Sequence, residues 1–525
     1  MTTDTPPTLE ELRNVVARYA AGAIDSQGAY LALGKFIDAA GDAGDAQELE
    51  LALGLADRIE PACAPVFACL VIYARANAWA SLRVVRTDET SAWAWDQPEL
   101  LQEIYWLRSA IQHPGFEELP KPRRAQILCN LGNALSAAGR FVDATSEWRH
   151  ALAEQPELGM AHGNLGEGLI WYARLLYDPG HSVLFLQQGR NELAQAVAGG
   201  IGRDGGTYPD ALNHFRSKLL YVEEWLRANN AGKDFELKVY QLGRSKQERN
   251  YREWALSRRL FLNPLNDLFP EPIAAQDVLM LPTHRATEAG ITFLAFYNQL
   301  KQEYAFARWS LFEGRTRRGL HIADKNVALA FNADYAQYST AIEQIKTAFR
   351  CAYSLFDKIA YFVNDYWKLG IPERQVNFRS VWVEPAKDKG SAFQVRPPLE
   401  ATKNFPLRGL YWISKDLFDA SLKDVAQPNA MDLDKLRNHL EHKYVKVVDA
   451  MARAMGPPGE LFADRLAHQV EREELERRTE RLLQLVRSAL IYLSLAMHLE
   501  EKNSVPEGVH ATSLEVELYP ERLKR

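Results

Sequence analysis

Apolar residues recur at helical spacing over most of the chain, and the alternation that is typical of strands is rare. From Thr8 to about Leu226, stretches rich in Ala and Leu are broken by Gly, Asp and Pro. From about Gly290 onward, the pattern is that of longer amphipathic helices. Apolar positions three or four residues apart place one face of a helix in a core. The pattern therefore predicts an all-α protein with two helical parts.

The N-terminal part contains an internal repeat. Leu131-Gly132 recurs as Leu165-Gly166, 34 residues later, and Asn130 recurs as Asn164. The positions between them that fit a repeat are Leu135, Gly139, Ala144, Trp148, Ala151 and Pro156. This spacing resembles the tetratricopeptide repeat, in which small residues allow two helices to approach and a proline ends the second. We predict a tetratricopeptide-like α-solenoid over residues 1–228, because a single repeat cannot bury its own face. A generic helical bundle is the alternative, and in either case we expect a surface for a partner.

Residues 229–287 differ in composition and are predicted to be an Arg-rich connector. Basic residues surround Trp254, and an apolar segment, Phe261–Pro270, follows them. The basic residues are Arg244, Lys246, Arg249, Arg252, Arg258 and Arg259. Basic and aromatic residues together can contact RNA. We favour a docking segment whose aromatic side chains pack on the next domain, with solvated arginines.

The C-terminal part, residues 288–503, is predicted to be a four-helix bundle, followed by a tail over 504–525. The expected helices cover about 290–313, 336–369, 432–454 and 471–501. An irregular insertion, 371–405, separates the second from the third, and Val376, Phe378, Val381 and Val383 indicate a short strand or β-hairpin within it. Four amphipathic helices with one interrupted connection form a bundle.

The third of these helices carries polar residues opposite its apolar face. Its apolar stripe is formed by Leu433, Leu436, Leu440, Val447 and Met451. Asn438 and His442 are four residues apart and lie on the opposite side, with Arg437 beside them. Tyr444 lies at the edge of the stripe, so we expect it to be partly packed. We expect His439 to be a surface residue, since it points away from Asn438.

These residues resemble the R-x(4–6)-H motif of HEPN domains, which are four-helix bundles. The segment is Arg437-Asn438-His439-Leu440-Glu441-His442, followed by Lys443-Tyr444. The resemblance covers about 288–502, and it implies a metal-independent endoribonuclease in which Arg437, Asn438 and His442 are catalytic. It further implies that Tyr444 supports the site or is modified by a partner nucleotidyltransferase, as in HEPN toxin–antitoxin pairs. Antiviral defence or growth arrest in bacteria is the implied setting.

Pairs within the R-x(4–6)-H range also occur elsewhere in the chain. Arg108 and His113 lie among the repeats, where Pro114 ends the helix. Arg315 and His321 lie between two glycines, in a predicted loop. Only Arg437 and His442 combine the spacing with a long helix of the predicted bundle, an adjacent Asn and a Tyr two residues after the His. Context, not spacing, selects this copy.

The residue types fit RNA cleavage without a metal ion. The reaction removes a proton from a ribose 2′-OH, stabilises charge on phosphorus and protonates the leaving 5′-oxygen. An imidazole such as that of His442 can transfer protons near neutral pH. Arg437 offers a fork of donors to phosphate oxygens, and Asn438 can orient either partner. One motif supplies one His for two proton transfers. The resemblance to HEPN ribonucleases, which dimerise so that two motifs face one cleft, implies a homodimer with a composite site that releases a 2′,3′-cyclic phosphate.

Composition and the absence of known motifs argue against several other classes of function. The 525 residues carry 62 Lys and Arg against 68 Asp and Glu, and the net charge of −6 argues against a globally basic RNA-coating protein. The four cysteines form no C-x-x-C pair, and no P-loop, Rossmann fingerprint or H-E-x-x-H is present, so we predict no cofactor and no metal. The N-terminus has no secretory pattern, and the longest apolar run, 489–497, is too short for a membrane span. We expect a cytoplasmic protein with no membrane partner.

The predicted partners are an RNA substrate, a second copy of the chain, and either a nucleotidyltransferase antitoxin or a phage or host trigger protein bound by the repeat module. A non-enzymatic scaffold is the competing class. In that case both halves bind proteins, and the bundle serves for dimerisation or nucleotide binding.

Overall fold

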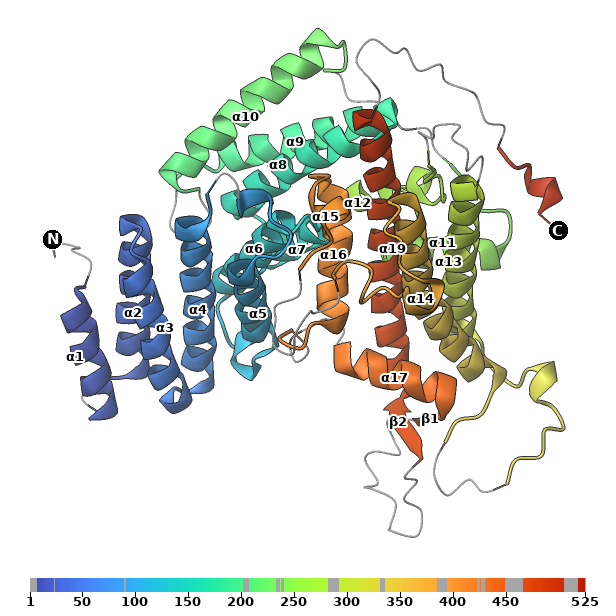
Figure 1. Cartoon of the computed structure of the whole chain (residues 1–525), viewed down its shortest axis with the longest axis horizontal. Coiled ribbons are helices and arrows are strands. Elements are labelled where there is room, and N and C mark those ends of the chain that lie inside the picture. Colours follow the sequence, from blue (N-terminus) through green and yellow to red (C-terminus); the bar gives the residue numbers. More distant parts are fainter. Residues whose placement is uncertain are drawn as a thin grey trace.

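The computed structural model confirms the predicted all-α fold (Figure 1). It describes residues 7–524 except for twelve gaps. The gaps are 23, 89–90, 202–206, 233–236, 238–239, 282–291, 331–335, 385–393, 423–424, 426–429, 449–465 and 505–517. The side chains of 430–432, 434 and 435 also lie outside the description. Apart from one small sheet and two isolated bridges, the regular elements in these residues are helices.

The N-terminal part is a row of helices packed side by side with short connections (Figure 1). Neighbouring helices such as α6 and α7, or α8 and α9, pack along their lengths. The helices are α1 (Leu9–Ala20), α2 (Ser26–Ala43), α3 (Ala46–Ile59), α4 (Pro65–Arg86), α5 (Pro98–Gln112), α6 (Lys121–Ala137), α7 (Phe141–Glu154), α8 (Gly159–Leu175), α9 (Pro179–Ala198) and α10 (Pro209–Ala228), with 3₁₀ turns η1 (Glu60–Ala62), η2 (Ser91–Trp93) and η3 (Pro114–Phe116).

The predicted repeat coincides with α6, α7 and the start of α8. A Cβ atom at Gly132 would lie 2.5 Å from Nε1 of Trp148, so only a glycine leaves room for the indole between the helices. That Nε1 donates a hydrogen bond to Oδ1 of Asn133 at 2.9 Å. A Cβ at Gly166 would lie 2.8 Å from the carbonyl oxygen of Gly189, so α8 and α9 also approach closely. The glycines and the tryptophan of the repeat therefore act as the sequence pattern predicted.

The connector packs on the C-terminal part through its aromatic side chains, as expected. It contains α11 (Lys246–Ser257), α12 (Leu265–Leu268) and η4 (Pro272–Ala274). Tyr251 and Trp254 on α11 contact Phe312 on α13, with ring centroids 5.3 Å and 5.5 Å apart. Asp267 on α12 pairs with the buried Arg487 of α19 at 2.7 Å. The connector is therefore part of one continuous core and not a free linker.

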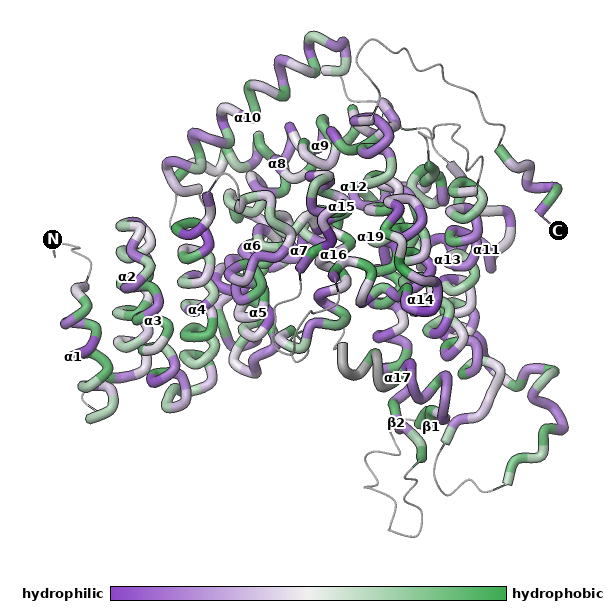
Figure 2. Tube along the Cα trace, viewed as in Figure 1, coloured by the Kyte–Doolittle hydropathy of each residue, from purple (hydrophilic) through white to green (hydrophobic). Residues whose placement is uncertain are grey.

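Four long helices form the C-terminal bundle. They are α13 (Thr292–Thr316), α14 (Thr340–Tyr366), α16 (Phe405–Phe418) and α19 (Arg472–Asn503), with η5 (Ile322–Asp324), η6 (Glu373–Gln375) and α15 (Pro397–Glu400) between them, and η8 (Glu521–Leu523) near the C-terminus. The first, second and fourth match the predicted helices. The prediction of a third bundle helix at 432–454 is wrong, because α16 is the third helix of the bundle and packs on α19. The middle of α19, the central helix of this part, is apolar and buried over 489–497 (Figure 2).

The predicted third helix is instead a shorter helix followed by a strand. α17 (Ala430–His442) ends twelve residues before the expected end at 454, and β1 (Tyr444–Val448) follows it. β1 pairs in parallel with β2 (Ala467–Glu471), with Tyr444 opposite Ala467. The run Tyr-Val-Lys-Val-Val is rich in β-branched and aromatic residues, which favour a strand over a helix. Met451, the last residue of the predicted apolar stripe, lies outside the described residues.

The predicted hairpin in the insertion is reduced to one antiparallel bridge between Val383 and Val395. The chain between them, 385–393, lies outside the described residues. Val376, Phe378 and Val381 are buried but not in a strand. They fill the core beside α14 and α16, and for example the rings of Phe356 and Phe378 lie 4.9 Å apart.

A buried ionic network joins the two helical parts. Arg108 of α5 makes two hydrogen bonds to the carboxylate of Asp416 on α16, at 2.7 Å and 2.8 Å. Arg140, at the start of α7, binds the same carboxylate. The hydroxyl of Tyr492 on α19 donates to Asp143 at 3.0 Å and accepts from the backbone N–H of Val142 at 3.1 Å. These side chains fix the two parts against each other.

Two helices are long and apolar enough to cross a membrane by length and composition, Pro65–Arg86 and Arg472–Asn503. Both are mostly buried among other helices, as the core helices of soluble proteins are. The four cysteines are free thiols. Cys69 and Cys129 are buried, whereas Cys63 and Cys351 are half-buried.

Candidate functional site

The predicted motif lies at the C-terminal end of α17, which crosses one end of the bundle (Figure 1). Leu433 and Leu436 are fully buried and hold α17 on α14 and α16. Asn438 and His442 are exposed. The helix therefore presents two of the three predicted catalytic side chains to solvent.

Helix geometry brings Asn438 and His442 together but separates Arg437 from His442. At 3.6 residues per turn, positions four apart differ by about 40° around the axis, and positions five apart by about 140°. Asn438 and His442 therefore share one face of the last turn. Arg437 projects towards a different side, and the structure of a single chain does not bring its guanidinium group and the imidazole into one cluster.

Arg437 packs on the bundle. Its guanidinium carbon lies 5.5 Å from the ring centroid of Tyr353 on α14, and Tyr353 is only 6% exposed. A cation over an aromatic face is stabilised by the ring electrons. The N–H donors of a guanidinium group lie in its plane, so stacking by the face leaves donor positions for a phosphate. Nothing in the sequence indicated Tyr353, which lies 84 residues before Arg437 and on another helix.

His439 contacts a second histidine that the sequence did not single out. Its ring centroid lies 5.2 Å from that of His468 on β2. His439 is half-buried, not on the open surface as expected. The contact depends on the parallel pairing that places His468 opposite Val445, and because the sequence was taken to be helical there, no signal pointed to it. His439 thus helps to hold β2 on α17.

Tyr444 is more exposed than expected. Its side chain is 43% exposed, although we expected it to be partly packed at the edge of a helical stripe. The difference arises because α17 ends at His442, and Tyr444 is the first residue of β1. The three residues that follow it alternate between the two faces of the strand.

The charge of this segment differs from that of the whole chain. Between 437 and 448 there are three cationic side chains, Arg437, Lys443 and Lys446, against the single carboxylate of Glu441. The whole chain has a net charge of −6. A local positive charge attracts phosphate groups even where the average charge does not.

Two of the other pairs within this range have structural roles. Arg108 is buried in the network with Asp416, and Nδ1 of His113 accepts a hydrogen bond from the backbone N–H of Gly115 at 3.1 Å. Arg315 lies in the last turn of α13, not in a loop, and pairs with Glu476 and Glu480 of α19. His321 caps the short turn η5 by accepting from the N–H of Ala323. Neither Arg is near its His in a shared site.

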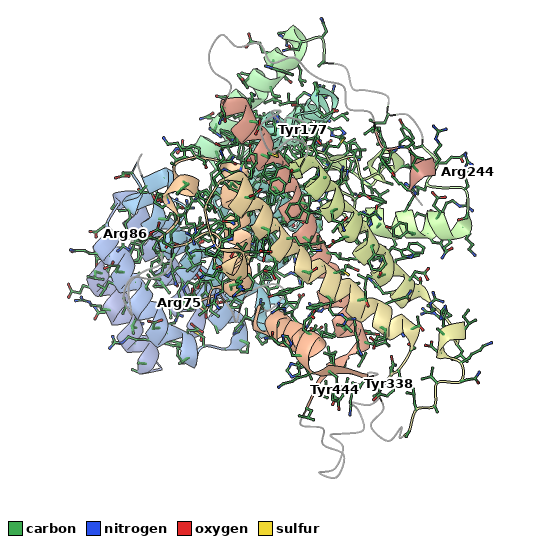
Figure 3. All side chains as sticks on the ribbon, turned by 45° about the vertical axis from the view of Figure 1, so that its right-hand side comes forward. Arg75, Arg86, Tyr177, Arg244, Tyr338 and Tyr444 are labelled. Carbon is green, nitrogen blue, oxygen red and sulfur yellow. The ribbon has the colours of Figure 1, made fainter. Side chains whose placement is uncertain are left out.

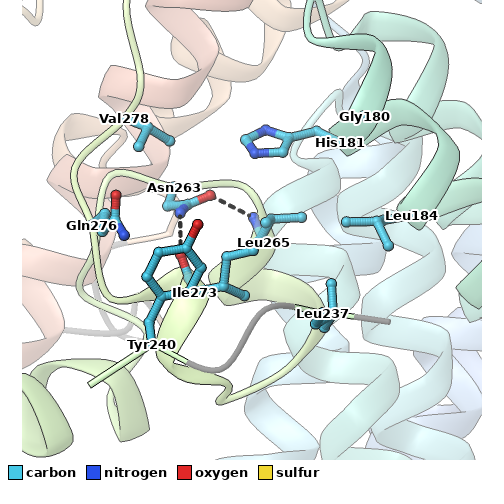
Figure 4. A pocket seen from close by; sticks show the side chains of 10 residues that line it. All are labelled: Gly180, His181, Leu184, Leu237, Tyr240, Asn263, Leu265, Ile273, Gln276 and Val278. Carbon is cyan, nitrogen blue, oxygen red and sulfur yellow. Dashed lines mark hydrogen bonds between the residues drawn. The ribbon is translucent and has the colours of Figure 1, made fainter. Parts of the chain in front are cut away.

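The main cavities lie elsewhere. Figure 4 shows one of about 310 Å³ between α9 and the connector, with a mostly apolar lining. Its Asn263 is engaged by the chain, since Oδ1 accepts from the N–H of Leu265 at 3.0 Å. Burial lowers the pKa of His181 at its edge. A wider cavity of about 720 Å³ is lined by residues of α9 and α10 and by Asn230 and Gly232. Among the residues that the structure describes, no three His, Cys, Asp or Glu side chains are grouped as a bound metal ion requires.

Comparison with known protein families gives a match in the C-terminal part. Residues 285–500 match the family model of the LA2681-like HEPN domain. This match supports a HEPN domain over the bundle and α17, and it includes every residue of the candidate site. No curated protein and no solved structure matches the chain.

Proposed function

We propose that this protein is a cytoplasmic, metal-independent endoribonuclease whose active site is the exposed last turn of α17. The observation that carries the proposal is the joint exposure of Asn438 and His442 on a helix anchored by buried leucines, inside the region that matches an HEPN family. An anchored helix with a solvated polar turn can present these groups to a large substrate such as RNA.

In this proposal the three residues divide the work. His442 transfers a proton to or from a ribose oxygen. Arg437, stacked on Tyr353, directs its donors to the oxygens of the scissile phosphate. Asn438 shares the face of His442 and orients the imidazole or the phosphate. The 2′-oxygen then attacks phosphorus and the 5′-oxygen leaves, which produces a 2′,3′-cyclic phosphate and a 5′-hydroxyl.

A homodimer is part of the proposal. Cleavage gains from a separate acid and base, and one motif supplies one exposed imidazole. A second copy facing the same cleft supplies the other, and it also brings its own Arg437 towards the His442 that is turned away from it within a single chain. The large angle between the two side chains is therefore compatible with a site shared by two subunits.

The N-terminal helices are proposed to be a tetratricopeptide-like solenoid that regulates the nuclease. Their rigid junction with α16 and α19 provides a route by which a bound trigger protein could act on the bundle. Antiviral defence or toxin–antitoxin growth arrest is the proposed setting. The exposed hydroxyl of Tyr444 is accessible to a nucleotidyltransferase antitoxin, as the HEPN toxin pattern implies.

A non-catalytic scaffold is the second candidate, and one observation favours it. Arg437 is stacked on a buried tyrosine and separated from His442, so it also fits a purely structural role. In that case the exposed turn binds a protein or a nucleotide and no reaction takes place.

The decisive experiment compares two histidines that share the same spacing from an arginine. We expect His442→Ala to reduce cleavage of total RNA and tRNA by about 10²–10⁴-fold, the usual contribution of a general acid or base. His113→Ala is the matched control and should keep full activity. EDTA should leave wild-type cleavage unchanged. Equal cleavage by the wild type and His442→Ala, with EDTA blocking both, would refute the proposal. The absence of cleavage by an active dimeric preparation would favour the scaffold.

A further inference from the structure

Two exposed tyrosines lie beside the candidate site. Tyr444 is 43% exposed and begins β1, two residues after His442. Tyr338 is 55% exposed and lies in the segment that leads into α14. This segment runs antiparallel to β1, because Ala336 forms a bridge with Val448 and the N–H of Gln337 donates to the carbonyl oxygen of Val447 at 2.8 Å.

The strand pairing places the side chains of Tyr338 and Tyr444 on one face of the small sheet. Residues two apart in a strand point to the same face, so Tyr444, Lys446 and Val448 share a face, as do Ala336 and Tyr338. Ala336 is opposite Val448, and two residues further along, the same register places Tyr338 next to Lys446 and diagonal to Tyr444. Figure 3 shows Tyr338 and Tyr444 at the same end of the molecule, next to β1.

We propose that Tyr338 and Tyr444 form a stacking platform for unpaired bases of the RNA substrate. This inference rests on the proposed function and adds the substrate class, which is single-stranded RNA and not duplex. Every base has a flat face that can stack on an aromatic ring, and in a duplex those faces are already stacked. A base on Tyr444 holds the backbone of its nucleotide near His442.

The surrounding charges fit this occupant. Lys443 is exposed between His442 and Tyr444. Lys446 shares the face of the two tyrosines but is only 8% exposed, so Lys443 is the cation that a phosphate can reach. An exposed cation beside aromatic rings is typical of surfaces that bind single-stranded nucleic acid, since it pairs with a phosphate while the rings stack on bases. An apolar protein surface would leave the exposed ammonium group of Lys443 without a counter-charge.

A different surface at this end suits a protein contact better. Leu320, Ile322, Val327 and Leu329 are each more than half exposed and precede Tyr338 in the chain. Contiguous exposed aliphatic side chains are typical of protein interfaces. The face with the two tyrosines differs from this aliphatic segment because it combines exposed aromatic rings with the nearby cation of Lys443.

The experiment measures RNA binding without cleavage. The full chain carrying His442→Ala is titrated with a short fluorescein-labelled unpaired RNA, and separately with the same RNA annealed to its complement. We expect Tyr444→Leu and Tyr338→Leu each to weaken binding of the unpaired RNA by about 5- to 150-fold, the range for losing one stacked base. Binding of the duplex should not change.

Two further variants separate the ring from other effects. Tyr444→Phe keeps the ring but removes the hydroxyl that a nucleotidyltransferase would modify, and it should bind like its parent. Tyr208→Leu, at an exposed tyrosine at the start of α10, is the matched control and should also bind normally. Circular dichroism and light scattering check that each variant remains folded and keeps its oligomeric state.

The possible failures are distinguishable. Unchanged binding of unpaired RNA by both Leu variants overturns the platform, as does an equal loss for duplex, or a loss in Tyr444→Phe as large as in Tyr444→Leu. A changed oligomeric state with unchanged RNA affinity assigns the tyrosines to a protein contact and also overturns it. If His442→Ala leaves cleavage intact while the Leu variants lose binding, the platform stands and the proposed reaction fails.

Discussion

The chain contains the same arginine–histidine spacing in two regions with opposite environments. At the junction of the helical parts, Arg108 is 3% exposed and bound on both nitrogens by Asp416, and His113 caps a turn. At the end of the bundle, Arg437 is half-buried on an aromatic ring, and His442 is exposed. One pair holds the fold together, and the other remains available to a substrate.

The difference shows that spacing alone does not decide a role. At the junction, a buried carboxylate accepts hydrogen bonds from both terminal nitrogens of the arginine. At the bundle end, an aromatic ring orients the arginine without using its donors. The predictions below test this contrast between a structural region and a functional one.

The largest effect on stability is expected at Asp416. Asp416→Asn leaves the guanidinium groups of Arg108 and Arg140 buried without their counter-charge, and breaking such a pair costs about 3–5 kcal/mol in the free energy of unfolding. Urea denaturation followed by circular dichroism measures it. His442→Ala should leave the same denaturation curve unchanged.

The control for this variant is an exposed ion pair between the same two parts. Asp96 precedes α5 and pairs with Lys415, the neighbour of Asp416 on α16, but the Asp96 side chain is 46% exposed. Asp96→Asn should cost less than about 1 kcal/mol. A similar loss in both variants would contradict the importance of burial at the junction.

The same network predicts a dependence of stability on pH. Burial alone would raise the pKa of Asp416, but Arg108 and Arg140 hold it well below its usual range. A carboxylate with a lowered pKa stabilises the fold above the unfolded value of about 3.9, and this contribution is lost as the pH falls towards the folded value. The stability difference between the wild type and Asp416→Asn should therefore be constant near neutral pH and shrink below about pH 4. A difference that stays constant down to pH 2 would show that Asp416 does not titrate as stated.

A smaller effect is expected at the ring beneath Arg437. Tyr353→Leu removes the stacking partner and should reduce RNA cleavage by about 2- to 30-fold, which corresponds to the range of a cation–π contact. Tyr353→Phe keeps the ring and should retain most of the activity. Arg437→Ala in the Tyr353→Leu background should then cost less than Arg437→Ala alone. Additive losses would show that the two side chains act independently.

Sequence patterns predicted the helices better than they predicted the third element of the bundle. Long amphipathic stretches predicted the ends of α13, α14 and α19 to within a few residues, because one apolar face must be buried whatever the topology. Val447 fitted the helical stripe by spacing and was assigned to a helix. In the structure it lies in a strand that pairs with residues beyond a segment of 18 residues, and such pairing leaves no local signal.

The sequence by itself determined the all-α class, the helix pair around Trp148, and the position of Arg437, Asn438 and His442 on one helix. These features depend on local periodicity and on the size of single side chains. Only the tertiary structure decided that Arg108 is structural, that Arg437 stacks on Tyr353, that His439 contacts His468, and that Tyr444 and Tyr338 lie on one face of the small sheet. Each of these depends on contacts between residues far apart in the chain, which are set by packing and strand pairing and not by local pattern.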